Sequence, residues 1–135
     1  MVVKIVLVLR ADLPPALAAN AAAVLGLALG GRLERSVAAD SPDASGTLHA
    51  GLNPVPVPTL VASAEELRAL HDQATSAADV TVVGFNEVAR RSRTYSEYEQ
   101  ALAATPSHTL DYVGLIVHGP HNGVTKLTKR LELMA

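Results

Sequence analysis

Basic side chains are grouped at two points of the chain, and anion binding is the first chemistry they offer. Arg90, Arg91 and Arg93 follow one apolar segment, and Lys126 opens a second group near the C-terminus. Guanidinium groups bind phosphate or carboxylate in a bidentate manner, so we expect Arg90, Arg93 and Lys126 to share an anion site if the two preceding strands run the same way. The alternative is two solvated faces, with the arginines paired to neighbouring glutamates.

A second candidate site lies where the first apolar run ends, at Arg10 and Asp12, just before a helix. Ligands of α/β sheets collect beyond strand ends and at helix N-termini, which favours a binding or catalytic role for both side chains. The alternative is an ion pair between Arg10 and Asp12, with Asp12 capping the helix that follows.

Asn20 is the only strongly polar side chain of an apolar helix expected at residues 14–29. A buried amide needs partners that offset its lost hydration. Asn20 therefore either binds a substrate backbone or satisfies buried polar groups of a loop or of a second subunit.

Metal and cofactor chemistry have little support. His118 and His121 have H-x-x-H spacing, but Gly119 and Pro120 separate them, and no nearby cysteine or carboxylate completes a ligand set. Serine-hydrolase elbows, phosphate-binding loops and dinucleotide-binding turns are missing from the sequence. We expect no metal and no cofactor.

Length and composition bound the class of protein. At 135 residues we expect one domain, residues 1–135, and the net charge of -2 gives no overall attraction to nucleic acid. The absence of cysteine and of a basic leader predicts a cytoplasmic protein. The longest apolar stretch, residues 13–29, is interrupted and shorter than the roughly 20 residues of a spanning helix, so no membrane association is expected.

Strand and helix patterns alternate along the chain. The inner strands are expected at Lys4 to Arg10, Asp79 to Phe85 and Tyr112 to Val117, with weaker strands at 46–51 and at 57–61, the latter at a sheet edge. The helix starts are marked by Ser63 with Glu66, by Asn86, and by Thr94 with Glu97. The pattern predicts an α/β fold, a three-layer α/β/α sandwich around a small mixed sheet.

The helix at 14–29 also predicts an oligomer. It is apolar nearly all round, and the chain has one Phe and no Trp with which to cover it. We therefore expect a homodimer that buries this helix against a partner.

Both ends of the chain resemble the type II peptidyl-tRNA hydrolases. The resemblance rests on Arg10–Leu13 after the first strand, on Gly119–Pro120 after the last strand, and on Lys126–Thr128 with the leucines that follow. Asn20 falls where that family has glutamine. The resemblance implies a hydrolase-like fold and tRNA as a ligand.

The middle of the chain departs from the enzyme. Residues 14–17 hold no lysine, Ala23 replaces a histidine, and Asn86 and Thr94 occupy the positions of an aspartate and a threonine. An amide cannot act as the base that a carboxylate could be. Residues 85–95 resemble instead an uncharacterised family of short proteins with the hydrolase fold, known mainly as a domain of unknown function.

Three functions follow as hypotheses. The favoured one is a protein of unknown function that binds an anionic ligand or RNA end without esterase turnover. Its ligand-binding candidates are Arg10, Asp12, Asn86, Arg90, Arg93 and Lys126. The alternatives are a divergent aminoacyl- or peptidyl-tRNA hydrolase and a dimeric interaction protein. The catalytic candidates of the hydrolase are Asp12, Asn20, Asn86 and Thr94.

Overall fold

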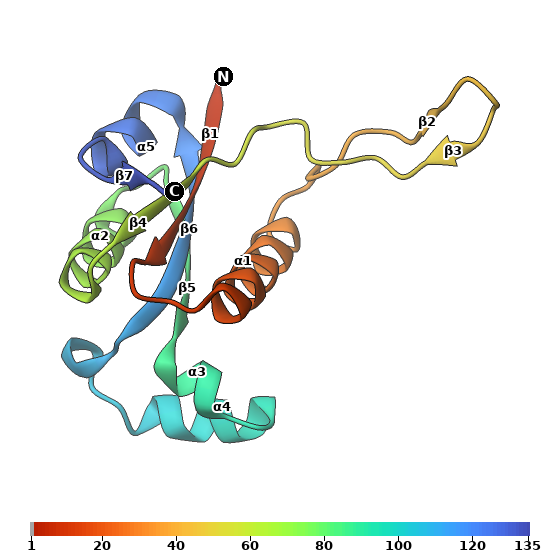
Figure 1. Cartoon of the computed structure of the whole chain (residues 1–135). Helices are drawn as coiled ribbons and strands as arrows, with labels where there is room; N and C mark the ends of the chain where they lie inside the picture. Colours follow the sequence, from red (N-terminus) through yellow and green to blue (C-terminus); the bar gives the residue numbers. More distant parts are fainter. Residues whose placement is uncertain (1) are drawn as a thin grey trace.

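The computed structural model of the protein describes residues 2–135 and centres on a five-stranded mixed sheet (Figure 1). The strand order is β5-β6-β1-β4-β7. β1 and β4 are parallel, whereas β6 runs antiparallel to both of its neighbours, β1 and β5. The strands are β1 (Val3–Arg10), β4 (Thr59–Ala62), β5 (Thr81–Asn86), β6 (Tyr112–Pro120) and β7 (Glu132–Leu133). The C-terminal ends of β1, β4 and β5 therefore lie at the same edge of the sheet.

The central strands come from opposite ends of the chain. β1 pairs with β6 from Val3↔Pro120 to Leu9↔Gly114, and the side chains of Ile5 to Leu9 are all buried. Strands covered on both faces read as continuous apolar runs, which is why the sequence predicts these two as inner strands.

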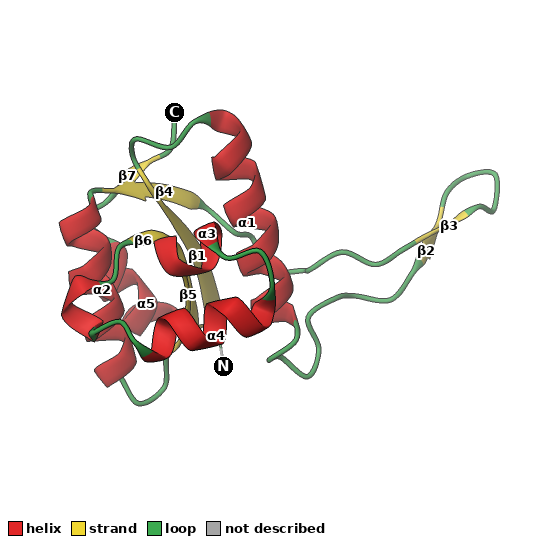
Figure 2. Ribbon diagram, turned by 90° about the horizontal axis from the view of Figure 1, so that it is seen from below, coloured by secondary structure: helices red, strands yellow, loops and turns green. Residues whose placement is uncertain are grey.

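Helices cover both faces of the sheet, as predicted (Figure 2). Helix α1 (Pro15–Gly30) packs on one face, where Leu25 is completely buried. Helices α2 (Ala64–Ser76) and α5 (His121–Thr128) pack on the other face. Alternate side chains of β1 enter the two cores, so each face of the sheet has its own apolar cluster. No helix among residues 2–135 has the length and apolar character needed to cross a bilayer.

The predicted helix starts are confirmed at three places. The Ser63 hydroxyl accepts a hydrogen bond from the Glu66 amide at 3.1 Å, and the Glu66 carboxylate accepts one from the Ser63 amide at 2.9 Å. Thr94 and Glu97 form the same box at the start of α4 (Tyr95–Ala103). Asn86 caps α3 (Glu87–Arg91). Such caps satisfy amides that have no partner within the helix, and each contributes about 1 kcal/mol.

The strand expected at 57–61 begins at Thr59 and is not at the edge of the sheet. β4 is covered instead by β7, which pairs with it through Leu60↔Leu133 and was not predicted. A strand of two residues is too short to show an alternation of apolar and polar side chains, so periodicity could not identify β7. A single-turn 3-10 helix, η1 (Ser107–Thr109), precedes β6.

Residues 32–58 leave the body of the protein as a long excursion (Figures 1 and 2). It contains the short antiparallel pair β2 (Ser41–Pro42) and β3 (Leu48–His49). The strand expected at 46–51 is thus present, but it pairs only within this excursion and not with the main sheet.

Gly84 lets β5 lie against the buried ring of Tyr112, which stacks on His71 with ring centroids 4.6 Å apart. A Cβ atom at Gly84 would lie 2.7 Å from Tyr112 Cε1. We predict that Gly84→Ala lowers the free energy of unfolding by about 1–3 kcal/mol through overpacking. Urea unfolding measures this. Gly123→Ala is the control, because an added Cβ there meets nothing within 4 Å, and an equal loss in both variants would contradict the packing argument.

Candidate functional site

The ends of β1 and β5 bring Arg10 and Glu87 together. Arg10 Nη1 donates a hydrogen bond to Glu87 Oε1 at 3.1 Å, and its Nε donates to Asp12 Oδ1 at 2.7 Å. Nη1 also donates to the carbonyl of Tyr112, the first residue of β6, at 3.4 Å. The guanidinium group therefore joins the ends of β1 and β5 to the start of β6.

Glu87 also binds the arginines of its own helix. Arg90 Nη2 lies 2.6 Å and Arg91 Nε lies 3.5 Å from Glu87 Oε2. Burial raises the pKa of the Glu87 carboxyl, but hydrogen bonds from Arg90 and Arg10 outweigh burial and hold the pKa below its usual value. Glu87 thus remains ionised at neutral pH and offsets the positive charge around it.

Asp12 forms the expected ion pair but not the expected cap. The hydrogen bond from Arg10 lowers the pKa of the Asp12 carboxyl. Helix α1 has Pro14 as its N-cap, without any side-chain cap hydrogen bond. The prolines explain the difference: their preset φ angles begin the helix at Pro15 with Pro14 as the N-cap, so Asp12 lies two residues before the capping position.

Asn86 and Thr94 are held by their capping roles. Asn86 is buried, and its Oδ1 accepts the amide of Ala89 at 2.9 Å. Thr94 Oγ1 accepts the amide of Glu97 at 3.1 Å. Each oxygen thus already accepts a backbone hydrogen bond, which gives both side chains a structural role at a helix start.

Asn20 is exposed within the single chain, so no loop of the same chain buries its amide. Helix α1 buries Ala18, Ala21, Leu25 and Leu29 against the sheet, and the opposite face, with Asn20, has no cover. A helix that is apolar all round carries no periodic signal for its buried side, so the sequence could not place the amide.

The site expected to be shared by the arginines and Lys126 required β5 and β6 to run the same way, and this condition is not met. β5 and β6 are antiparallel, so the helix that follows β6 starts at the sheet edge opposite Arg90 and Arg93. Lys4, at the start of β1, donates to Thr125 of this helix at 3.0 Å. Sequence runs alone do not reveal strand direction, and direction decides which loops meet.

A cavity of about 580 Å³ is lined by both Arg93 and Arg32, and Arg32 was not among the predicted site residues. It lies between the C-terminal half of α1, the edge strand β5 and the start of α4. Ser92, Thr94, Tyr95 and Tyr98 also line it. Among residues 2–135, neither of its two guanidinium groups takes part in an ion pair with a carboxylate. Arg32 follows the Gly30–Gly31 helix end directly, and that position was the available signal.

Two tyrosines, Tyr95 and Tyr98, line the Arg32–Arg93 cavity, whereas His71 lies on α2. Tyr95 is 73% exposed and meets Tyr98 edge to face, with ring centroids 5.4 Å apart. Burial lowers the pKa of His71, which keeps this imidazole neutral at pH 7. Among residues 2–135, no group of three His, Cys, Asp or Glu side chains is placed to hold a metal ion.

We predict that Glu87→Gln lowers the free energy of unfolding by about 2 kcal/mol at pH 7, because Arg10 and Arg90 lose a charged acceptor. The lowered pKa means that this contribution is present above the unfolded pKa of about 4.3 and is lost as the pH falls through the folded value. Urea unfolding of parent and variant at pH 7 and pH 3.5 tests this. An equal difference at both pH values would contradict it.

Comparisons with known proteins agree on family and fold. The family model "Protein of unknown function (DUF2000)" matches residues 3–135. No curated protein matches the chain. A solved structure of a protein of unknown function from Agrobacterium tumefaciens, Atu0240, is 22% identical, with 98% of each chain covered and a TM-score of 0.89. Because the family model spans nearly the whole sequence, the chain belongs to the DUF2000 family of proteins of unknown function.

Proposed function

We propose that this protein binds an anionic ligand, such as an RNA end, in the cavity lined by Arg32 and Arg93, without esterase turnover. The observation that carries the proposal is the pair of arginines without carboxylate partners in one cavity. We place the ligand at Arg32 and Arg93, and not at Arg10 and Arg90, because Glu87 already accepts hydrogen bonds from both of the latter guanidinium groups.

The cavity combines charge with an aromatic surface. Arginine binds phosphate and carboxylate through paired N–H groups. An exposed tyrosine such as Tyr95 offers a face on which a nucleobase stacks, and base–aromatic stacking contributes about 1–3 kcal/mol per base. A nucleotide at the end of an RNA chain presents both chemistries, a phosphate and a base.

The hydrolase-like fold, the single domain, the homodimer and the cellular location are also proposals, and each has its own support. A type II peptidyl-tRNA hydrolase-like fold and a single domain over residues 1–135 are supported by the resemblance of both chain ends and by their pairing in β1 and β6. A homodimer is supported by the exposed face of α1. A cytoplasmic location is supported by the absence of cysteine.

We predict that Arg93→Ala and Arg32→Ala each weaken tRNA binding about tenfold and flatten its dependence on salt, because each removes one cation from the ligand. Fluorescence titration of labelled tRNA at two salt concentrations measures both effects. Arg130→Ala is the matched control, since this exposed arginine lies outside the cavity. Binding and salt slopes of both cavity variants equal to those of the parent would contradict the proposal.

We also predict that the protein releases no peptide from peptidyl-tRNA at a rate comparable to the enzyme family. The lysine and histidine positions are empty, Asn86 is held in its cap, and the lowered pKa of Asp12 weakens it as a base. Incubation with peptidyl-tRNA and separation of the products measures turnover. Rapid release that Asp12→Ala abolishes would favour the divergent hydrolase instead.

A further inference from the structure

The middle of the excursion, residues 37–54 and here called the arm, lies outside both apolar cores. Every residue from Val37 to Ala50 is exposed, and no arm residue belongs to a core cluster. Figures 1 and 2 show the arm extending away from the sheet and its helices. Residues 38–50 of the arm therefore gain no stability from packing on their own body, whereas Val37 and residues 51–53 at its base line a groove beside α1.

The hydrogen bonds of the arm are local. Ala38 N donates to Leu52 O at 2.9 Å near its base, and Asp43 N donates to Thr47 O at 2.9 Å near its tip. His49 Nε2 lies 2.8 Å from Asp43 Oδ2. An isolated two-stranded ribbon is at best marginally stable in water. An arm of this length needs another surface to hold it.

The arm also exposes apolar side chains to solvent. Val37 is 59% exposed, Leu48 is 66% exposed and Leu52 is 77% exposed. Exposed apolar groups gathered on one segment mark an interaction surface.

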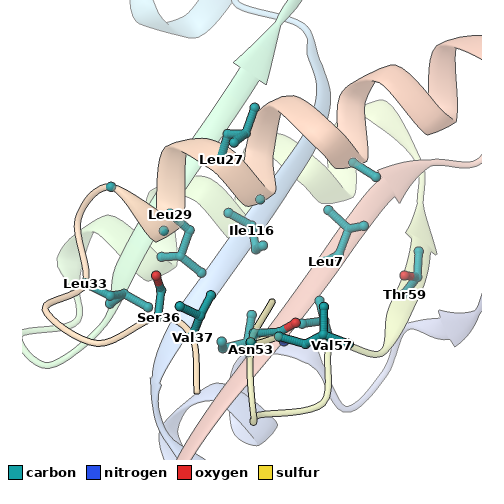
Figure 3. Close-up of a pocket in the computed structure, with 17 residues that line it drawn as sticks. Leu7, Leu27, Leu29, Leu33, Ser36, Val37, Asn53, Val57, Thr59 and Ile116 are labelled. Atoms are coloured by element: carbon teal, nitrogen blue, oxygen red, sulfur yellow. The ribbon is translucent and has the colours of Figure 1, made fainter. Parts of the chain in front are cut away.

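A complementary surface lies at the root of the arm. An apolar groove of about 710 Å³ lies between α1, the sheet and the two ends of the excursion (Figure 3). These ends contribute Leu33, Ser36, Val37, residues 51–53 and Val57 to its lining. Leu7, Leu29 and Ile116 form its floor, and Leu27, 80% exposed, stands at its rim. The groove extends along α1, which has no ionisable side chain from Leu13 to Gly31. The cores of protein interfaces are likewise depleted of charge.

We propose that two copies of the chain form a two-fold dimer in which the arm of each copy lies across α1 and the groove of the other. Both surfaces are present on one chain, so a two-fold axis satisfies each of them twice. The arm and the exposed face of α1 together approach the roughly 20–30 residues per side of a standard interface.

Charge complementarity also favours a second copy. The arm bears two carboxylates, Asp40 and Asp43, and no Lys or Arg, whereas residues 32–36 beside the groove bear Arg32 and Arg35 against one carboxylate, Glu34. The arm of the partner thus brings negative charge toward a segment of net positive charge. This inference goes beyond the anion-binding proposal and does not rest on it.

Light scattering of the full chain tests the dimer. The parent should have twice the monomer mass at micromolar concentration, and Leu48→Glu or Leu27→Glu should halve it. Both leucines are exposed within the monomer, so their replacement does not disturb either core. Leu133→Glu is the matched control, 70% exposed on β7, and should remain dimeric. A parent that is monomeric, or leucine variants that stay dimeric, would overturn the proposal.

Removal of the arm separates its role from that of α1. Because Ala38 N and Leu52 O are hydrogen-bonded, a short Gly-Ser link in place of residues 39–51 closes the chain at the base of the arm. The shortened protein should be monomeric, with an unchanged helical circular dichroism signal and a cooperative melt. A shortened protein that still dimerises would overturn the arm exchange.

Cross-linking tests the contact itself. The chain has no cysteine, so Leu27→Cys and Leu48→Cys each introduce a single thiol. A short bismaleimide should join a mixture of the two variants into dimers far more than either variant alone. Equal yields from the mixture and from the single variants would contradict the predicted pairing of arm with α1.

Discussion

β6 runs antiparallel between β5 and β1, and its first residue, Tyr112, therefore lies where both neighbouring strands end. Arg10 and Glu87 meet at that point, where the Arg10 guanidinium group donates hydrogen bonds to the Glu87 carboxylate and to the Tyr112 carbonyl. The same direction carries β6 to the far edge of the sheet before α5 begins. One strand orientation thus decides which polar side chains can cooperate and which are kept apart.

Electrostatics at this edge favour structure over binding. Glu87 accepts hydrogen bonds from Arg10 and Arg90 and also lies near Arg91, so its carboxylate engages two of the three arginines of the most conspicuous basic cluster. Arg93 lies beyond the reach of this network and lines a cavity with Arg32. Anion binding, the favoured interpretation of the sequence, accordingly rests on Arg93 together with Arg32, and not with Arg90 and Lys126 as expected.

Local signals predicted local structure well. The caps at Ser63, Asn86 and Thr94 follow from side chains that satisfy nearby amides, and the apolar run from Lys4 to Arg10 follows from burial on both faces. Features that depend on contacts between distant parts of the chain could not be predicted from the sequence. The exposed side of α1, and with it Asn20, depends on which elements pack against a uniformly apolar helix. The place of Lys126 depends on a strand direction that no residue pattern encodes.

The most direct test of anion binding in the Arg32–Arg93 cavity is a titration that is monitored through the backbone amide signals by nuclear magnetic resonance. Inorganic phosphate, and then tRNA, is added to the labelled protein while the backbone signals are monitored. Anion binding in the cavity should shift the signals of Arg32 and of residues 92–98 and leave the signals of Lys126 and its neighbours unchanged. Shifts concentrated around Lys126, or none at the Arg32–Arg93 cavity, would contradict it.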